Sequence, residues 1–223
     1  MSNYSVEALS LNKVFGRRLI FNNINFKFNN NGIFGISGPN GSGKSTLIKI
    51  IAGVTSPSSG QILHNFNSAP IIPEKLHNYI GFVSPYLVLY DEFSAWENLN
   101  YFSAIRNDQF NADKVNFLLD RFLLFNRKDD FVKTYSSGMK QRLKFIFALM
   151  HSPQLLLLDE PTSNLDSEGK DKVYSILKKE ADRSIIIIAS NEESDLEICS
   201  GLIRLEQFKN SDNSVRLKGN LTK

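Results

Sequence analysis

The stretch Gly38-Pro39-Asn40-Gly41-Ser42-Gly43-Lys44-Ser45-Thr46 matches the phosphate-binding loop pattern G-x-x-x-x-G-K-[ST]. A polyphosphate needs many backbone N–H donors converging on it, and the glycines allow the backbone to turn inward without Cβ atoms in the way. Lys44 supplies a positive charge for the β- and γ-phosphates, and Ser45 supplies a hydroxyl for a Mg²⁺ ion. The stretch therefore predicts a site for a nucleoside triphosphate.

The segments around this loop predict an α/β fold. Residues 33–36 are typical of a short buried strand, and residues 47–52 of an apolar helix, which gives the strand, loop and helix order that the motif requires. The apolar runs 155–158 and 185–188 are typical of strands covered on both faces, and the amphipathic segment 167–181 lies between them. We expect a mainly parallel sheet.

The rest of the chain adds two smaller units to this core. Short strand patterns over residues 6–11, 19–21 and 24–28 predict an N-terminal antiparallel β-subdomain, and residues 61–64 are a further strand candidate after the first helix. Helical spacing in residues 94–99 and 113–124 predicts an inserted α-helical subdomain. We expect one domain over residues 1–223, divided into 1–83 (β-subdomain and loop core), 84–150 (helical subdomain) and 151–223 (remaining core and tail).

Composition excludes several classes of protein. The net charge of +3, from 26 Lys and Arg against 23 Asp and Glu, is too balanced to favour a nucleic-acid partner. The single cysteine, Cys199, rules out an internal disulfide framework and fits a reducing compartment. Since no apolar run approaches the roughly 18 residues of a membrane span, we expect a cytoplasmic chain.

Asp159-Glu160 directly follows the run 155–158 and forms the second candidate site. A nucleotide-bound Mg²⁺ ion needs a carboxylate at the C-terminal end of a strand, where α/β sheets bind ligands. Asp159 is the candidate metal ligand, and Glu160 the candidate to orient or deprotonate the attacking water. The alternative is that two acids simply close the strand before Pro161.

Four segments together resemble the ATP-binding-cassette (ABC) ATPases in order and spacing; they are 38–46, Tyr135-Ser136-Ser137-Gly138-Met139-Lys140-Gln141-Arg142, 155–162 and Ser163-Asn164-Leu165-Asp166. The second is similar to the family signature LSGGQ, with Ser136 and Gly138 kept. The match extends to about Leu205. The residues of segment 135–142 are also similar to those of compact exporter ATPases, such as the haem-exporter subunit of cytochrome c maturation.

The resemblance implies roles that depend on a second subunit. In ABC ATPases the signature clamps the γ-phosphate bound to the other subunit, so Ser136 and Gly138 would complete a partner's ATP site in a head-to-tail homodimer or heterodimer. Asp166 would lie at that interface, and Phe15 would stack on adenine. The alternatives are that residues 135–138 only cap a helix and that Phe15 is an ordinary core or surface aromatic.

Two departures from the family pattern concern catalysis. Where the family places a glutamine after the strand 79–83, this chain has Ser84-Pro85, and Pro85 has no side chain that could contact metal or water. Ser84 is the candidate to substitute for the glutamine at short range. Where the family places a histidine on the γ-phosphate, this chain has Asn191, which cannot carry a positive charge. We expect hydrolysis about tenfold slower as a result.

These features predict the ATP-hydrolysing subunit of an ABC transporter, peripheral on the cytoplasmic face of a membrane. The resemblance implies a transmembrane permease subunit that contacts residues 85–101, and it slightly favours export. The alternative for residues 85–101 is an internal loop packed on the helical subdomain. A rival is an ATP-dependent dimerisation switch with little turnover, which Asn191 and the missing glutamine favour and Glu160 argues against. A P-loop kinase would have no signature segment.

Overall fold

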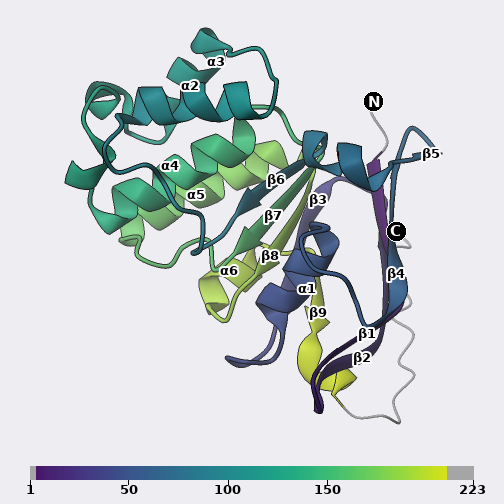
Figure 1. Ribbon diagram of the computed structural model, residues 1–223. Helices are drawn as coiled ribbons and strands as arrows, with labels where there is room; N and C mark the ends of the chain where they lie inside the picture. The colour runs from purple at the N-terminus through teal and green to yellow at the C-terminus, as the bar shows by residue number, and fades with distance from the viewer. Residues whose placement is uncertain (1–3, 210–223) are drawn as a thin grey trace.

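The computed structural model describes residues 4–209, and a five-stranded parallel sheet in the order β6-β7-β8-β3-β9 lies at its centre (Figure 1). The strands are β3 (Gly32–Ser37), β6 (Ile80–Val83), β7 (Leu155–Asp159), β8 (Ile185–Ala189) and β9 (Gly201–Arg204). Four helices accompany the sheet: α1 (Lys44–Ile51), α4 (Ser137–Leu149), α5 (Ser167–Glu180) and α6 (Glu193–Glu197). The predicted parallel sheet is confirmed, and it brings the C-terminal ends of β3, β7 and β8 to one edge.

The two apolar runs divide their side chains between the faces of this sheet. Every residue of β7 and β8 is buried. Leu156 and Leu158 join one core with residues of α4 and α5, whereas Leu155 and Leu157 join a second core with residues of α1 and the antiparallel strands. Because consecutive side chains of a strand point to opposite faces, an uninterrupted apolar run is what a strand covered on both sides requires.

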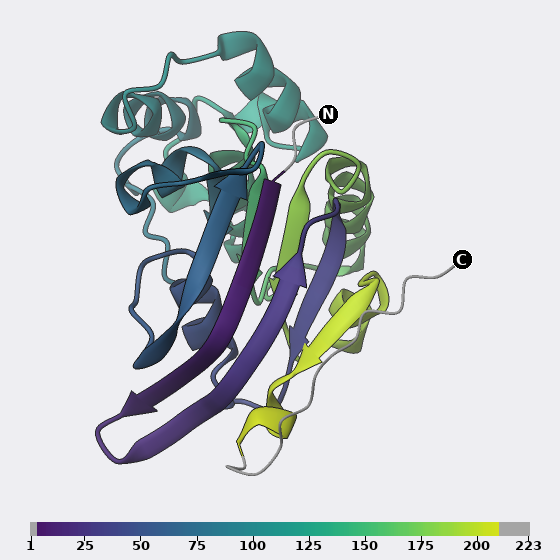
Figure 2. The same cartoon turned by 90° about the vertical axis from the view of Figure 1, so that its right-hand side faces the viewer.

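The predicted antiparallel β-subdomain is a four-stranded sheet in the order β2-β1-β4-β5. Its strands are β1 (Tyr4–Phe15), β2 (Arg18–Phe28), β4 (Ser59–Phe66) and the two-residue β5 (Ala69–Pro70). Figure 2 shows β1 and β2 as long neighbouring strands, with β4 on the other side of β1. The strands are longer than their sequence patterns, because pairing with a neighbour also stabilises the polar residues at their ends.

The helical subdomain contains α2 (Ala95–Ile105) and α3 (Ala112–Arg121), followed by the 3₁₀ turns Phe125–Arg127 and Val132–Thr134 and then by α4. Ser94 and Glu97 form the capping box of α2, with bonds of 3.1 and 2.8 Å. The predicted helix 113–124 ends early, at Arg121, because Leu123 adopts a φ of 56°, which an α-helix cannot contain. Within residues 4–209, no helix is both long and apolar enough to cross a membrane.

Candidate nucleotide-binding and catalytic site

The phosphate-binding loop connects β3 to α1 and contains two positions that only glycine can occupy without strain. Gly38 and Gly43 have φ values of 150° and 109°. A Cβ atom at Gly43 would lie 2.4 Å from Ile20 Cγ2, and one at Gly38 would lie 2.8 Å from Ser42 Oγ. The loop therefore turns where any side chain would clash, and α1 begins directly after it with its N–H groups facing the loop.

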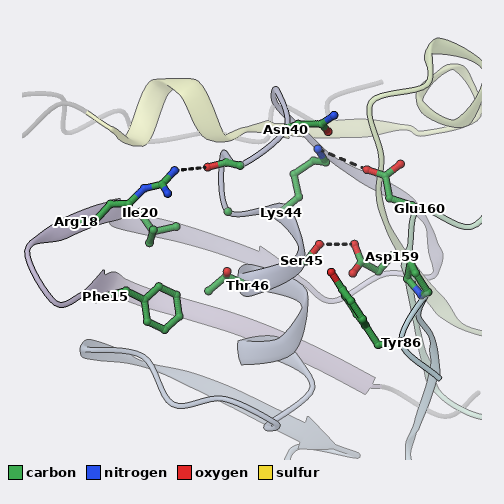
Figure 3. Close-up of a pocket in the computed structure, with 13 residues that line it drawn as sticks. Phe15, Arg18, Ile20, Asn40, Lys44, Ser45, Thr46, Tyr86, Asp159 and Glu160 are labelled. Atoms are coloured by element: carbon green, nitrogen blue, oxygen red, sulfur yellow. Dashed lines mark hydrogen bonds and ion pairs between the residues drawn. The ribbon is translucent and has the colours of Figure 1, made fainter. Parts of the chain in front are cut away.

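Lys44 is buried, and its ammonium is surrounded by oxygen atoms from three segments of the chain; Figure 3 shows its contact with Glu160. Its Nζ donates to Gly38 O at 2.9 Å and to Asn191 Oδ1 at 2.7 Å, and it lies 3.5 Å from Glu160 Oε1. Asn191 in turn donates to Asn40 Oδ1 at 2.6 Å. The structure thus brings together Lys44, Glu160 and Asn191, although 147 positions separate the first from the last.

Asp159 and Ser45 form the part of the site that fits a metal ion. Ser45 Oγ donates to Asp159 Oδ1 at 2.9 Å, while Asp159 Oδ2 is buried and has no hydrogen-bond partner among residues 4–209. Burial raises the pKa of Asp159, against the opposing hydrogen bond from Ser45 and the charges of Lys49 and Lys44. A buried carboxylate oxygen without a partner is costly. Mg²⁺ prefers such oxygen ligands, so this pair of side chains fits it.

Glu160 occupies a sharp turn immediately after β7. Its φ is 49°, which is unusual for a residue with a side chain. The turn is fixed on both sides, because Glu160 N donates to Ala189 O at 2.8 Å and Ser163 Oγ donates to Glu160 O at 2.8 Å. The carboxylate is 30% exposed and borders the same cavity as Lys44 and Asp159. It is accordingly placed to contact a molecule in that cavity.

One open cavity of about 420 Å³ joins these groups, which is within the usual size of small-molecule sites. It is lined by Phe15, Arg18, Ile20, Asn40, Gly41, Gly43, Lys44, Ser45, Thr46, Pro85, Tyr86, Asp159 and Glu160. Nothing in the sequence indicated Arg18, and Tyr86 fell in the segment 85–101 expected to contact the permease, not at the nucleotide site. Arg18 belongs to β2, and its Nη2 donates to Gly41 O at 3.4 Å. The β-subdomain therefore contributes a cation next to the phosphate-binding loop.

Phe15 lies at the end of this cavity that is formed by the β-subdomain, and its ring is 52% exposed. Lys13 Nζ lies 4.6 Å from the ring centroid. An exposed aromatic ring on the wall of a cavity can stack on a base. The position of Phe15 is compatible with the predicted stacking on adenine, which no contact within residues 4–209 tests.

We expect Phe15→Ala to weaken ATP binding about 5- to 150-fold, because stacking of a base on an aromatic side chain is worth roughly 1–3 kcal/mol. Calorimetric titration with ATP measures the loss. Inorganic tripolyphosphate should bind the variant as it binds the parent, and Phe117→Ala, which removes another exposed ring under a cation, should leave ATP binding unchanged. Equal ATP affinity in the parent and Phe15→Ala would show that Phe15 is an ordinary surface aromatic.

The signature residues and Asp166 do not line this cavity. Ser136 is the N-cap of α4 and accepts from Met139 N at 3.2 Å, and Asp166 is the N-cap of α5 and accepts from Gly169 N at 2.8 Å. Gly138 packs against the loop before Asp166, where a Cβ atom would lie 3.2 Å from Asn164 O. Both caps are exposed. Within one chain these residues form a separate surface.

The segment after β6 departs from the expectation for Ser84. Ser84 is buried, and its hydroxyl accepts from Tyr86 N at 3.2 Å, so it does not line the cavity. Pro85 and Tyr86, the next two residues, do line the cavity. Tyr86 stacks under Lys49, with Nζ 4.5 Å from the ring centroid, and Figure 3 shows its hydroxyl directed toward Ser45 and Asp159. The side chain nearest the position of the missing glutamine is thus a phenol.

Comparison with known proteins identifies the family of this chain. The ABC transporter family model matches residues 21–163. The lantibiotic transport ATP-binding protein SrtF of Streptococcus pyogenes is 33% identical over 221 residues, which cover 95% of this chain and 94% of SrtF. The Nod factor export ATP-binding protein I of Cupriavidus metallidurans is 30% identical over 202 residues, and YdbJ of Bacillus subtilis, an uncharacterized ABC transporter ATP-binding protein, is 32% identical over 200.

The chain covers only 66% of the Nod factor protein and 65% of YdbJ. None of these three names is that of a haem exporter, so the narrower resemblance gains no support from them. A putative ABC transporter ATP-binding protein from Pyrococcus furiosus has the same fold, with a TM-score of 0.79 at 23% identity over 92% of this chain and 100% of that one. The chain therefore belongs to the ABC transporter family, as one of its ATP-binding ATPase subunits.

Proposed function

We propose that this chain hydrolyses Mg²⁺-ATP in a dimer of ATPase subunits and thereby drives an export permease from the cytoplasmic face of a membrane. The observation that carries the proposal is that Lys44, Asp159 and Glu160 line one cavity, with Asn191 hydrogen-bonded to Lys44 beside it. The names of SrtF and of the Nod factor protein support transport, and the second supports export. The exported molecule depends on a membrane subunit outside this chain.

The chemistry is in-line attack of water on the γ-phosphorus of ATP, with cleavage of its bond to the bridging oxygen of ADP. Lys44 holds the β- and γ-phosphates, and Ser45 with Asp159 would hold Mg²⁺. When bound, the ion neutralises developing charge on the phosphates. Glu160 orients the water and accepts its proton, and Asn191 donates an N–H to the γ-phosphate.

A second subunit would complete this site. Ser136 and Gly138 lie at the N-terminus of α4, a typical anion-binding position, yet they do not line the cavity of their own chain. The signature of one subunit would therefore bind the γ-phosphate held by the other, with Asp166 at the interface. A second copy of this chain is the simplest partner, since it presents the same two surfaces.

The segment from Pro85 to Tyr101 supplies a docking surface for the permease. Tyr86, Val88 and Tyr90 are 72%, 82% and 53% exposed. Leu89, by contrast, is buried in the core, and Leu87 packs partly against it. The segment thus combines an internal anchor with an exposed apolar strip, which suits contact with an apolar partner.

Turnover distinguishes this proposal from the dimerisation switch, which the neutral Asn191 side chain beside Lys44 favours. Phosphate release by the purified chain is measured at saturating ATP, with Mg²⁺ and with excess EDTA. The transporter proposal predicts multiple turnovers that require Mg²⁺. ATP binding without turnover would instead support the switch.

We expect Asn191→His to raise the rate of hydrolysis about tenfold, which corresponds to roughly 1.4 kcal/mol of transition-state stabilisation. A histidine can carry a positive charge, and charge-assisted hydrogen bonds are about twice as strong as neutral ones. Phosphate release at saturating Mg²⁺-ATP measures the change, with Asn191→Ala as the comparison that removes the side chain. A rate for Asn191→His no higher than that of the parent would contradict this explanation of slow hydrolysis.

A further inference from the structure

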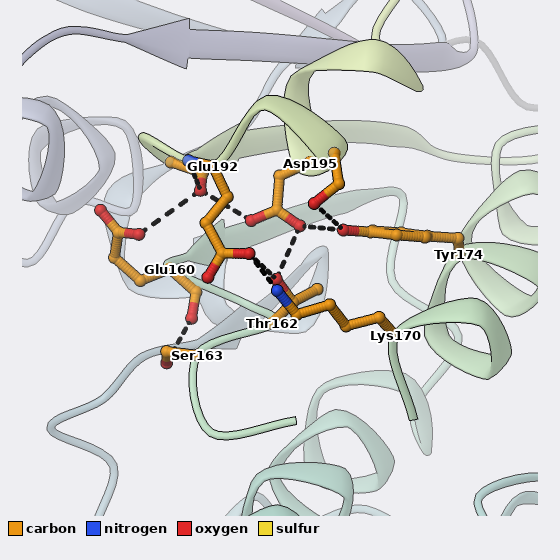
Figure 4. A network of polar contacts seen from close by, with 9 residues as sticks. Glu160, Thr162, Ser163, Lys170, Tyr174, Glu192 and Asp195 are labelled. Carbon is orange, nitrogen blue, oxygen red and sulfur yellow. Dashed lines mark hydrogen bonds and ion pairs between the residues drawn. The ribbon is translucent and has the colours of Figure 1, made fainter. Parts of the chain in front are cut away.

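Asp195 is a buried acid with three hydroxyl donors on its carboxylate (Figure 4). Ser190 donates to Oδ2 at 2.6 Å, Thr162 to Oδ1 at 2.9 Å and Tyr174 to Oδ1 at 2.7 Å. Hydrogen bonds to an ionised group are among the stronger ones in proteins, and a buried charge needs several of them. The carboxylate thus accepts three hydrogen bonds from hydroxyls, and no Lys or Arg among residues 4–209 forms an ion pair with it.

The three donors come from three different segments, and two of these segments carry candidate catalytic residues. Thr162 follows Glu160 by two positions after β7, and Ser190 directly precedes Asn191 after β8. Tyr174 belongs to α5 and donates its hydrogen bond to the carboxylate from that helix. A single side chain therefore joins the segments that follow two neighbouring strands, one carrying Glu160 at the cavity and the other carrying Asn191 beside Lys44.

Ser190 forms the direct link to Glu160. Its Oγ lies 3.4 Å from Glu160 Oε2, accepts from Glu192 N at 3.1 Å and makes its shortest contact with Asp195. A serine hydroxyl has one proton. The 2.6 Å contact directs that proton mainly to Asp195, so the 3.4 Å contact of Ser190 with Glu160 is the weaker of the two and limits where the Glu160 carboxylate can lie.

We propose that Asp195 is a positioning residue for ATP hydrolysis, which acts through Ser190 and Thr162 to hold Glu160 and Asn191 beside the γ-phosphate. This role rests on the hydrolytic function proposed above. A neighbouring ion pair between Lys170 and Glu192 also ties α5 to the loop after β8. The network therefore connects α5 to the loop after β8. Through Ser190 and Thr162 it reaches the segments that carry Asn191 and Glu160.

The chain offers a matched control for Ser190 at the opposite end of the same strand. Ser184 immediately precedes β8, is 3% exposed, and donates to Pro153 O at 2.7 Å. Ser190 immediately follows β8, is fully buried, and donates at 2.6 Å. Substituting either serine by alanine removes one short, buried hydrogen bond that the hydroxyl donates next to the parallel sheet. Ser190→Ala also removes the bond that the hydroxyl accepts from Glu192 N, and only Ser190 is close to the site.

The test compares Ser190→Ala, Asp195→Asn and Ser184→Ala with the parent in three measurements: thermal midpoint, ATP affinity in EDTA by calorimetry, and kcat for phosphate release. We expect similar midpoints for the two alanine variants and ATP affinities within about twofold of the parent for all three. Ser190→Ala and Asp195→Asn should lose at least about tenfold in kcat, and Ser184→Ala should retain it. Ser190→Thr, which restores the hydroxyl, should recover most of the parent rate.

Equal kcat values for Ser190→Ala and Ser184→Ala would overturn the positioning role and leave Asp195 a purely structural acid. Losses in ATP affinity that match the losses in kcat would overturn it as well, since the network would then act on binding. A parent protein without turnover would overturn the hydrolytic function itself and, with it, this role. The rate of the parent therefore separates the two failures.

Discussion

Lys44→Ala is expected to weaken ATP binding at least about 100-fold. The Lys44 ammonium is buried and provides charge-assisted hydrogen bonds, each worth roughly 1.5–3 kcal/mol. Its removal would also leave the carboxylates of Asp159 and Glu160 without the cation between them and the anionic ligand. Repulsion from two acids would then add to the lost attraction. Calorimetric titration with ATP in EDTA measures this effect without turnover or metal.

Lys27→Ala is the control for Lys44→Ala, because Lys27 forms an exposed ion pair with Glu7 on the β-subdomain. Exposed pairs contribute little to stability, so this variant should fold and bind ATP as the parent does. ATP affinities within about threefold for Lys44→Ala and the parent would mean that the loop at residues 38–46 is not the phosphate site. Nucleotide binding would then have to be sought elsewhere on the chain.

Glu160→Gln is expected to reduce kcat about 10²- to 10⁴-fold and to leave ATP affinity unchanged, which is the usual size of a general-base contribution. The amide has nearly the same shape as the carboxylate but cannot accept a proton. The backbone bonds of Glu160 to Ala189 and Ser163 do not involve its side chain, so the turn should survive. Single-turnover phosphate release and calorimetric ATP binding measure the two quantities separately.

Glu74→Gln provides the matched control, since it removes the charge of an exposed glutamate in the 3₁₀ turn before β6. Its kcat should equal that of the parent. If Glu160→Gln turned over as fast as the parent, Glu160 would not act on the water, and the reaction would require another base.

Much of the fold could be predicted because it depends on local patterns. The runs Leu155–Leu158 and Ile185–Ile188 have no polar interruption, and only a strand covered on both faces can bury them completely. The glycine loop fixes the junction between β3 and α1 by steric exclusion. Helix ends were harder to predict. The left-handed backbone of Leu123 ends α3, and its side chain gives no sign of that conformation.

The site was predictable where its residues follow strands and unpredictable where they depend on distant packing. Asp159, Glu160 and Asn191 all lie at C-terminal ends of parallel strands, which meet at one edge. Tyr86 and Arg18 reach the cavity from segments whose direction the sequence does not reveal. Asp195 lies in an acidic segment with the pattern of a solvated helix, and only the packing of α5 against it shows that it is buried.

Light scattering of Glu160→Gln tests most directly the claim that two copies of this chain share their ATP sites. Without nucleotide, the measured mass should be that of one 25.2 kDa chain. With Mg²⁺-ATP it should double, because a γ-phosphate that is not hydrolysed keeps the signature of one copy on the ATP of the other. A protein that binds ATP at saturation and still has the mass of one chain would contradict the shared site.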